Sequence, residues 1–141
     1  MREGTESLLA AVAKAADHSL DLGDPEDHLA IHRGCYILNS LGHGPVYDYR
    51  LYVKGPYSPE LAEDLRLIKA IPEETDIPPE AVNALRNILE RGTTYTEAYA
   101  TVLLIRNKNL GVSPERILNR ALELKPNLDS EVREACASLL N

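Results

Sequence analysis

Apolar residues recur along most of this chain at the three- and four-residue spacing of amphipathic helices. Most of these stretches begin at a residue that favours a helix start, such as Ser, Thr, Asp or Pro, and end near a Gly or Pro. The pattern predicts about seven helices, at residues 5–16, 24–41, 58–70, 80–91, 94–109, 113–125 and 129–140.

Several of these helices carry a specific capping signal. Three starts pair a capping side chain with Pro at the first helical position: Asp24-Pro25, Ser58-Pro59 and Ser113-Pro114. Thr5 is expected to cap the first helix. Thr94 and Glu97 have the spacing of a capping box and are expected to begin the fifth helix.

One stretch has the two-residue alternation of a β-strand. Val46 to Val53 alternates polar with aromatic or β-branched residues, and this is the only strong strand signal in the chain. Gly55-Pro56 is expected to supply the turn between this strand and the helix that starts at Ser58. Any sheet is therefore expected to be small.

These elements predict a mainly α protein: one compact multi-helix domain over residues 1–141, with one short β-strand or hairpin. The strand lies within residues 1–77, and residues 78–141 are expected to be helical throughout. A length of 141 residues is typical of one domain, and 44% hydrophobic with 26% charged residues is typical of a globular protein. The longest nearly uncharged apolar run, residues 98–105, is too short to span a membrane.

The net charge of -7 is unevenly distributed. Residues 1–77 hold 7 basic and 14 acidic side chains, whereas residues 78–141 hold 8 of each. This charge disfavours nucleic acids and anionic membranes as partners. The first residues lack the basic and apolar regions of a signal peptide, which predicts a cytoplasmic location. Cys35 and Cys136 are expected to be reduced and buried there.

Sequence signatures of catalysis are missing: no G-x-S-x-G, Walker loop, dinucleotide fingerprint or H-E-x-x-H occurs. We therefore assign no catalytic residue and no cofactor, and a non-enzymatic protein is the favoured interpretation. His28, His32 and Cys35 follow one another at offsets of four and three, so they could share a helix face and bind zinc. Packing is favoured over a metal site, because that face must also be buried and no second ligand cluster accompanies it.

Tyrosines gather around the predicted strand. Phe and Trp are absent, yet Tyr47, Tyr49, Tyr52 and Tyr57 fall within eleven positions. A two-residue period cannot point all four inward, so some are expected to pack and others to contact a partner beside Lys54. The candidate partner-binding residues are Tyr49, Tyr52, Lys54 and Tyr57, and packing remains the equal alternative for each tyrosine.

Helix-turn-helix spacing supplies an alternative surface. Residues 94–109, the turn 110–112 and residues 113–125 form helix, Gly-containing turn and helix. Residues 106–125 hold five basic and two acidic side chains. Arg116, Asn119 and Arg120 are the candidate nucleic-acid contacts, although a simple helical hairpin has the same pattern.

Three segments carry a family resemblance: residues 36–42 (YILNSLG), Gly55-Pro56-Tyr57-Ser58 followed by Leu61 and Asp64-Leu65, and Leu124-Lys125-Pro126 before the last helix. They resemble the YwgA-like family of uncharacterised prokaryotic proteins and, more distantly, the Panacea-type antitoxin domain. The resemblance implies a winged-helix-like N-terminal part and a regulatory, antitoxin-like binding role. The chain departs from that pattern at His32, Arg33 and Gly34, where such helices are more apolar or lysine-rich.

Two functions follow as hypotheses. The first is a cytoplasmic, non-enzymatic regulatory or protein-interaction domain that contacts a protein partner through the tyrosine-rich strand. The second is a DNA-binding transcriptional regulator that uses residues 94–125. The sequence leaves a homodimer open and identifies no particular partner.

Overall fold

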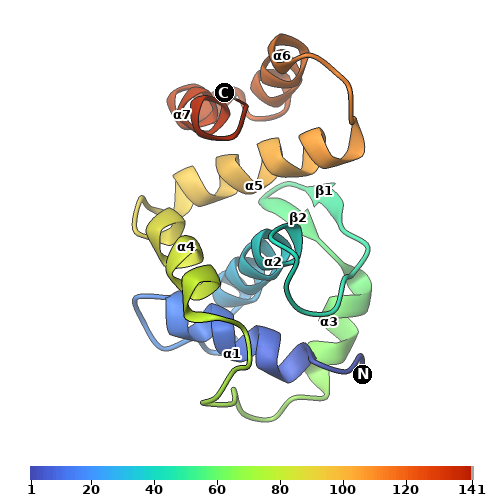
Figure 1. Cartoon of the computed structure of the whole chain (residues 1–141), viewed down its shortest axis with the longest axis vertical. Coiled ribbons are helices and arrows are strands. Elements are labelled where there is room, and N and C mark those ends of the chain that lie inside the picture. The colour runs from blue at the N-terminus through green and yellow to red at the C-terminus, as the bar shows by residue number, and fades with distance from the viewer. Residues whose placement is uncertain (141) are drawn as a thin grey trace.

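The computed structural model describes residues 1–140, which form seven α-helices, one short 3-10 helix and one two-stranded hairpin (Figure 1). The mainly α class with a small hairpin is confirmed. In chain order the elements are α1 (Thr5–Ala15), α2 (Pro25–Ser40), β1 (Arg50–Tyr52), β2 (Gly55–Tyr57), α3 (Pro59–Arg66), α4 (Pro79–Leu89), α5 (Thr93–Lys108), α6 (Pro114–Leu124), η1 (Pro126–Leu128) and α7 (Asp129–Leu139).

Helix α5 crosses the middle of the molecule, between α1, α2 and α4 on one side and α6 and α7 on the other (Figure 1). Ten of its 16 residues are buried, because each of its faces packs against a separate hydrophobic cluster. Leu103 and Leu104 belong to the cluster with α1, α2 and α4, while Val102 and Ile105 belong to the cluster with α6 and α7.

The contact between α1 and α2 is close at Gly34. A Cβ atom at this position would lie 2.8 Å from Cγ1 of Val12, which is closer than side chains tolerate. The glycine therefore lets the two helices pack with Leu8, Leu9 and Ile31 fully buried between them.

The hairpin differs from the predicted strand and turn. β1 covers only Arg50–Tyr52 and pairs antiparallel with β2, so that Tyr52 faces Gly55 across a turn formed by Val53 and Lys54. The prediction that Gly55-Pro56 forms the turn was wrong, because both residues lie in β2. Residues 46–49 have no partner strand, and their tyrosines enter the hydrophobic core instead.

Three of the predicted caps are confirmed: the side chains of Asp24, Ser58 and Ser113 accept hydrogen bonds from backbone N–H groups in the first turn of α2, α3 and α6. The caps predicted at Thr5 and Thr94 were wrong. α1 and α5 begin one residue after a glycine with no side-chain cap. Thr5 is bonded to Tyr47 and Glu97 is paired with Lys125, so these side chains have tertiary partners in place of local ones.

Within residues 1–140, every helix is too short or too polar to cross a membrane. Cys35 and Cys136 are both free thiols and both buried. They lie in different hydrophobic clusters, which confirms that they pack as small apolar residues. α3 ends at Arg66 instead of near residue 70, although Ile68 beyond it still packs into the core.

Candidate functional site

The tip of the hairpin exposes apolar side chains. Tyr52 is 53% exposed and Val53 83% exposed, and Lys54 beside them is also exposed. Tyr49 does not belong to this surface: it is 3% exposed, and its hydroxyl donates a hydrogen bond to Asn39. Tyr57 is half-buried, with its ring 4.8 Å from that of Tyr52. Two of the four predicted contact residues thus lie fully at the surface.

The ring of Tyr57 stacks on the buried side chain of His32. The ring of His32 stacks on Tyr57 at 4.2 Å between centroids and 12° between planes. His32 Nδ1 accepts a hydrogen bond from the backbone N–H of Ser58 at 3.1 Å, so the histidine also positions the start of α3. Burial lowers the pKa of His32 to about 3, and His32 is therefore neutral at physiological pH.

The zinc alternative for His28, His32 and Cys35 finds no favourable geometry. In residues 1–140 no three His, Cys, Asp or Glu side chains are grouped so that they could hold a metal ion. Burial raises the pKa of the Cys35 thiol well above its ordinary value, which disfavours the thiolate that binds zinc. His28 instead lies 4.8 Å from the ring of His32.

Two buried cations hold the backbone of the hairpin tip. Lys125 Nζ donates to the carbonyl oxygen of Val53 and lies 3.5 Å from that of Tyr52. Arg33 Nη1 donates to the carbonyl oxygen of Lys54 at 3.0 Å. All three carbonyls of the tip therefore have buried cationic donors, and the tip is pre-organised while its side chains remain exposed.

The cations share one buried carboxylate. Glu97 forms an ion pair with Lys125 at 3.0 Å, and the side chains of both are at most 10% exposed. Arg33, 3% exposed, is also attracted by Glu97. Sequence reasoning missed this cluster. The available signals were Arg33 and Glu97 themselves, each a charged residue within a helical stretch that is otherwise buried.

A groove beside the hairpin lies next to both candidate surfaces, the predicted partner-binding residues of the hairpin and one of the predicted nucleic-acid contacts on α6. It has a volume of about 330 Å³ and is lined by β1, α5 and α6, with Leu51, Leu104 and Leu124 among its apolar residues. Three cations also line it: Arg50, Lys108 and Arg120. We call Tyr52, Val53, Lys54 and these three cations the hairpin face.

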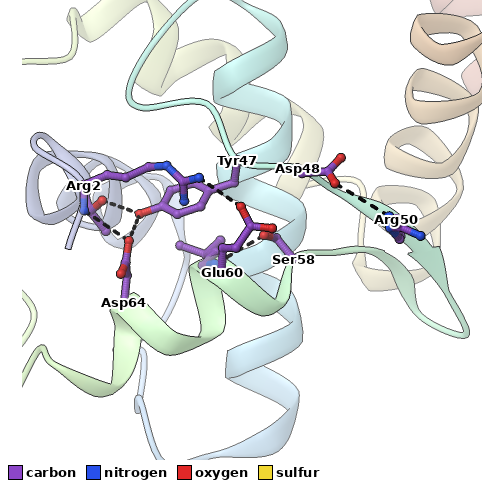
Figure 2. A network of polar contacts seen from close by, with 9 residues as sticks. Arg2, Tyr47, Asp48, Arg50, Ser58, Glu60 and Asp64 are labelled. Atoms are coloured by element: carbon purple, nitrogen blue, oxygen red, sulfur yellow. Dashed lines mark hydrogen bonds and ion pairs between the residues drawn. The ribbon is translucent and has the colours of Figure 1, made fainter.

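The cations of the groove are only partly neutralised. Arg120 lies 3.3 Å from Glu123, Arg50 lies 4.0 Å from Asp48 (Figure 2), and Lys108 donates to the carbonyl oxygen of Tyr49. These ion pairs are exposed and therefore weak. Arg116 and Asn119 are exposed on α6 but do not line the groove. The structure thus joins Arg120 to the hairpin and leaves the other two predicted nucleic-acid contacts apart.

Two acidic residues of α3, Glu60 and Asp64, have structural roles. Figure 2 shows Tyr47 between Arg2 and Asp64: its hydroxyl donates to Asp64 at 2.6 Å and accepts from Thr5, while the Arg2 guanidinium lies 4.2 Å from the ring centroid. Arg2 also pairs with Glu60 at 2.9 Å. The hydrogen bond from Tyr47 holds the pKa of Asp64 below its usual range.

We expect Tyr47→Phe to raise the pKa of Asp64 toward its ordinary value and to lower the free energy of unfolding by about 1 kcal/mol. Because the pKa of Asp64 is depressed in the folded state, its contribution to stability is complete above the unfolded pKa and is lost as pH falls through the folded pKa. In Tyr47→Phe, less stability is therefore lost when the pH falls. NMR titration of the Asp64 carboxyl carbon measures the shift.

Tyr99→Phe is the matched control, because Tyr99 is half-buried and its hydroxyl makes no hydrogen bond within residues 1–140. It should leave the pKa of Asp64 unchanged. An unchanged pKa in Tyr47→Phe as well would contradict the assigned hydrogen bond.

Comparison with known proteins identifies no relative: neither a family model, nor a curated protein sequence, nor a solved structure matches the chain.

Proposed function

We propose that this protein is a non-enzymatic regulatory domain that binds a protein partner through the hairpin face. The observation that carries the proposal is the hairpin tip, where Tyr52 and Val53 are exposed on a backbone whose carbonyls are held by buried Lys125 and Arg33. Exposed aromatic and aliphatic side chains on a rigid backbone lose little entropy when a partner covers them.

The groove supports a partner segment that is both apolar and acidic. Its leucines offer apolar contact area, and its three cations, Arg50, Lys108 and Arg120, outnumber its one carboxylate, Asp48. The net charge of -7 repels an acidic partner elsewhere on the surface, so this local excess of cations would orient an acidic segment toward the groove. The resemblance noted above, with its winged-helix-like N-terminal part and antitoxin-like binding role, is consistent with this regulatory function and belongs to the proposal.

Val53→Asp tests the proposal. We expect it to weaken the binding of a partner recovered from native lysate of the source organism at least about tenfold in Kd, because it places a charge on the most exposed apolar side chain of the hairpin tip. The Kd is measured with the purified partner by calorimetry, and circular dichroism checks that the fold is intact.

Val46→Asp is the control, since Val46 is 72% exposed and lies before β1, outside the hairpin. It should bind like the unmodified protein. Equal binding by both variants would exclude the hairpin tip as the contact.

DNA binding through α5 and α6 is the second candidate. Arg116, Asn119 and Arg120 are all exposed on a helix with a confirmed N-cap, which is the observation in its favour. The same preparations are titrated with a labelled DNA duplex at about 50 mM salt. Binding that falls steeply with salt, is lost in Arg116→Glu/Arg120→Glu and persists in Val53→Asp would replace the first proposal by the second.

A further inference from the structure

The two strands of the hairpin differ in what lies beside them. β2 packs against α2 and α5, and its residues are buried or half-buried. β1 pairs with β2 alone, and its residues are exposed or half-buried. The accessible edge of the hairpin is therefore that of β1. An open edge presents backbone N–H and C=O groups that a further strand can bond.

The backbone of Leu51 points to this open edge. Leu51 faces Pro56 across the hairpin, and Pro56 has no N–H, so this pair cannot exchange hydrogen bonds. The pairs on either side of it carry the ladder bonds, and the N–H and C=O of Leu51 consequently point away from β2. Neither group has a hydrogen bond to a loop or a side chain within residues 1–140. The middle of β1 thus offers one donor and one acceptor to a partner.

The open edge faces the groove between β1, α5 and α6. The C=O of Tyr49 shares a planar trans peptide with the N–H of Arg50, which points to β2, so this C=O points outward like that of Leu51. It accepts a hydrogen bond from Nζ of Lys108 at 2.6 Å. Lys108 and Leu51 both line the groove. The free backbone groups of Leu51 therefore lie on the side of β1 where the groove is.

Side chains along β1 alternate between two environments. Leu51 is half-buried beside Leu104 and Leu124 of the groove, whereas Arg50 and Tyr52 are exposed. A strand paired with β1 alternates in register with it, so every second side chain of that strand lies on the face of Leu51. The side chains between them lie on the face of Arg50, where opposite charges on neighbouring strands attract. Apolar residues suit the first face and carboxylates the second.

The charge of the groove favours the same occupant. Its three cations include Arg120 of α6, and its one carboxylate is Asp48. The whole chain carries a net charge of -7. An acidic segment is therefore attracted to the groove and repelled by much of the remaining surface, while a basic segment has the opposite preference.

We propose that the partner of the hairpin face supplies an extended segment of alternating apolar and acidic residues, which adds to the edge of β1 as a third strand. Its backbone bonds the N–H and C=O of Leu51, its apolar side chains enter the groove, and its carboxylates lie beside Arg50 and Arg120. Main-chain pairing contributes affinity, and the alternate side chains contribute specificity. This inference rests on the proposed function, because it describes the segment through which the partner binds.

Titration of the full chain with a blocked peptide of alternating leucine and glutamate, about six residues long, tests the proposal. One control peptide has lysine in place of glutamate and reverses the charge. A second control is the acidic peptide methylated at its leucine nitrogens, which removes the backbone donors and keeps the side chains. Each is added up to about 1 mM and followed by ¹⁵N NMR.

We expect the acidic peptide to bind at least about tenfold more tightly than either control, with the largest shift at the amide of Leu51. Hydrogen exchange of that amide should also slow, because it acquires an acceptor. No binding of the acidic peptide, equal binding of either control peptide, or an unshifted Leu51 amide would overturn the proposal.

Arg120→Glu provides the variant of the protein, because it reverses the charge of one residue that lines the groove. It should weaken binding of the acidic peptide at least about tenfold. Arg116→Glu is the matched control: Arg116 is exposed on the same helix, the substitution changes the net charge equally, and the residue does not line the groove. It should bind normally. Undiminished binding by Arg120→Glu, or an equal loss in both variants, would overturn the proposal.

The partner used to test Val53→Asp separates this inference from the proposed function. A partner that depends on Val53 but leaves the Leu51 amide unshifted would keep the proposed function and overturn the added strand. A partner that binds Val53→Asp and Val46→Asp equally would overturn the proposed function itself. A partner that depends on Val53 and shifts the Leu51 amide would support both.

Discussion

Replacing Lys125 by methionine should lower the free energy of unfolding by about 3–5 kcal/mol, because it removes the ion-pair partner of the buried Glu97 carboxylate and leaves only the more distant Arg33 to attract it. Glu97 and Lys125 are each 8% exposed, and their charged atoms lie 3.0 Å apart. Methionine retains most of the apolar stem, so the lost packing is small. The carbonyl of Val53 also loses its donor, and the hairpin tip should become mobile. Urea denaturation measures the free energy, and amide hydrogen exchange of residues 52–55 measures the mobility.

Lys69→Met is the matched control, since Lys69 is exposed and makes no polar contact in residues 1–140. It should change the free energy of unfolding by less than about 0.5 kcal/mol. Adding Glu97→Gln to Lys125→Met removes the unpaired charge and should restore at least about 1 kcal/mol. A Lys125→Met protein as stable as Lys69→Met would show that the pair is not buried as described.

Gly55→Ala should destabilise the protein by about 1–3 kcal/mol through backbone strain. Gly55 has φ of 113°, a conformation that residues with a Cβ rarely adopt. Crowding contributes little, because the added Cβ would lie 3.5 Å from Arg33 Cγ, an ordinary contact. The strain acts at the first residue of β2, opposite Tyr52, so we expect weaker partner binding as well as a lower thermal midpoint.

Gly23→Ala is the comparison, because Gly23 is exposed, has no positive φ, and its nearest neighbour would lie 3.4 Å from an added Cβ. Its free energy of unfolding should stay within about 0.5 kcal/mol of the unmodified protein. If both glycine variants lost the same free energy of unfolding, the loss would not come from the positive φ of Gly55.

The local sequence determined the helices and most of their starts. A capping side chain followed by Pro acts within one turn, so Asp24, Ser58 and Ser113 could be assigned without knowledge of the rest of the fold. The same holds for the mainly α class, because helical periodicity is a property of neighbouring residues. The same period also predicted that the four tyrosines near the strand would not all be buried, although it left open which of them would be exposed; Tyr52 is.

Only the tertiary structure decided the partners of the polar side chains that are buried. Thr5 and Glu97 have the residue types and spacing of helix caps, yet their partners are Tyr47 and Lys125, far away along the chain. Tyr49 was a candidate for a surface contact with packing as the equal alternative, and it is buried, because the residues before β1 have no partner strand and enter the core. The local sequence shows which side chains require a hydrogen-bond partner or a counter-ion once they are buried. Which residue becomes that partner depends on how the helices pack, because packing determines which polar groups are buried next to each other.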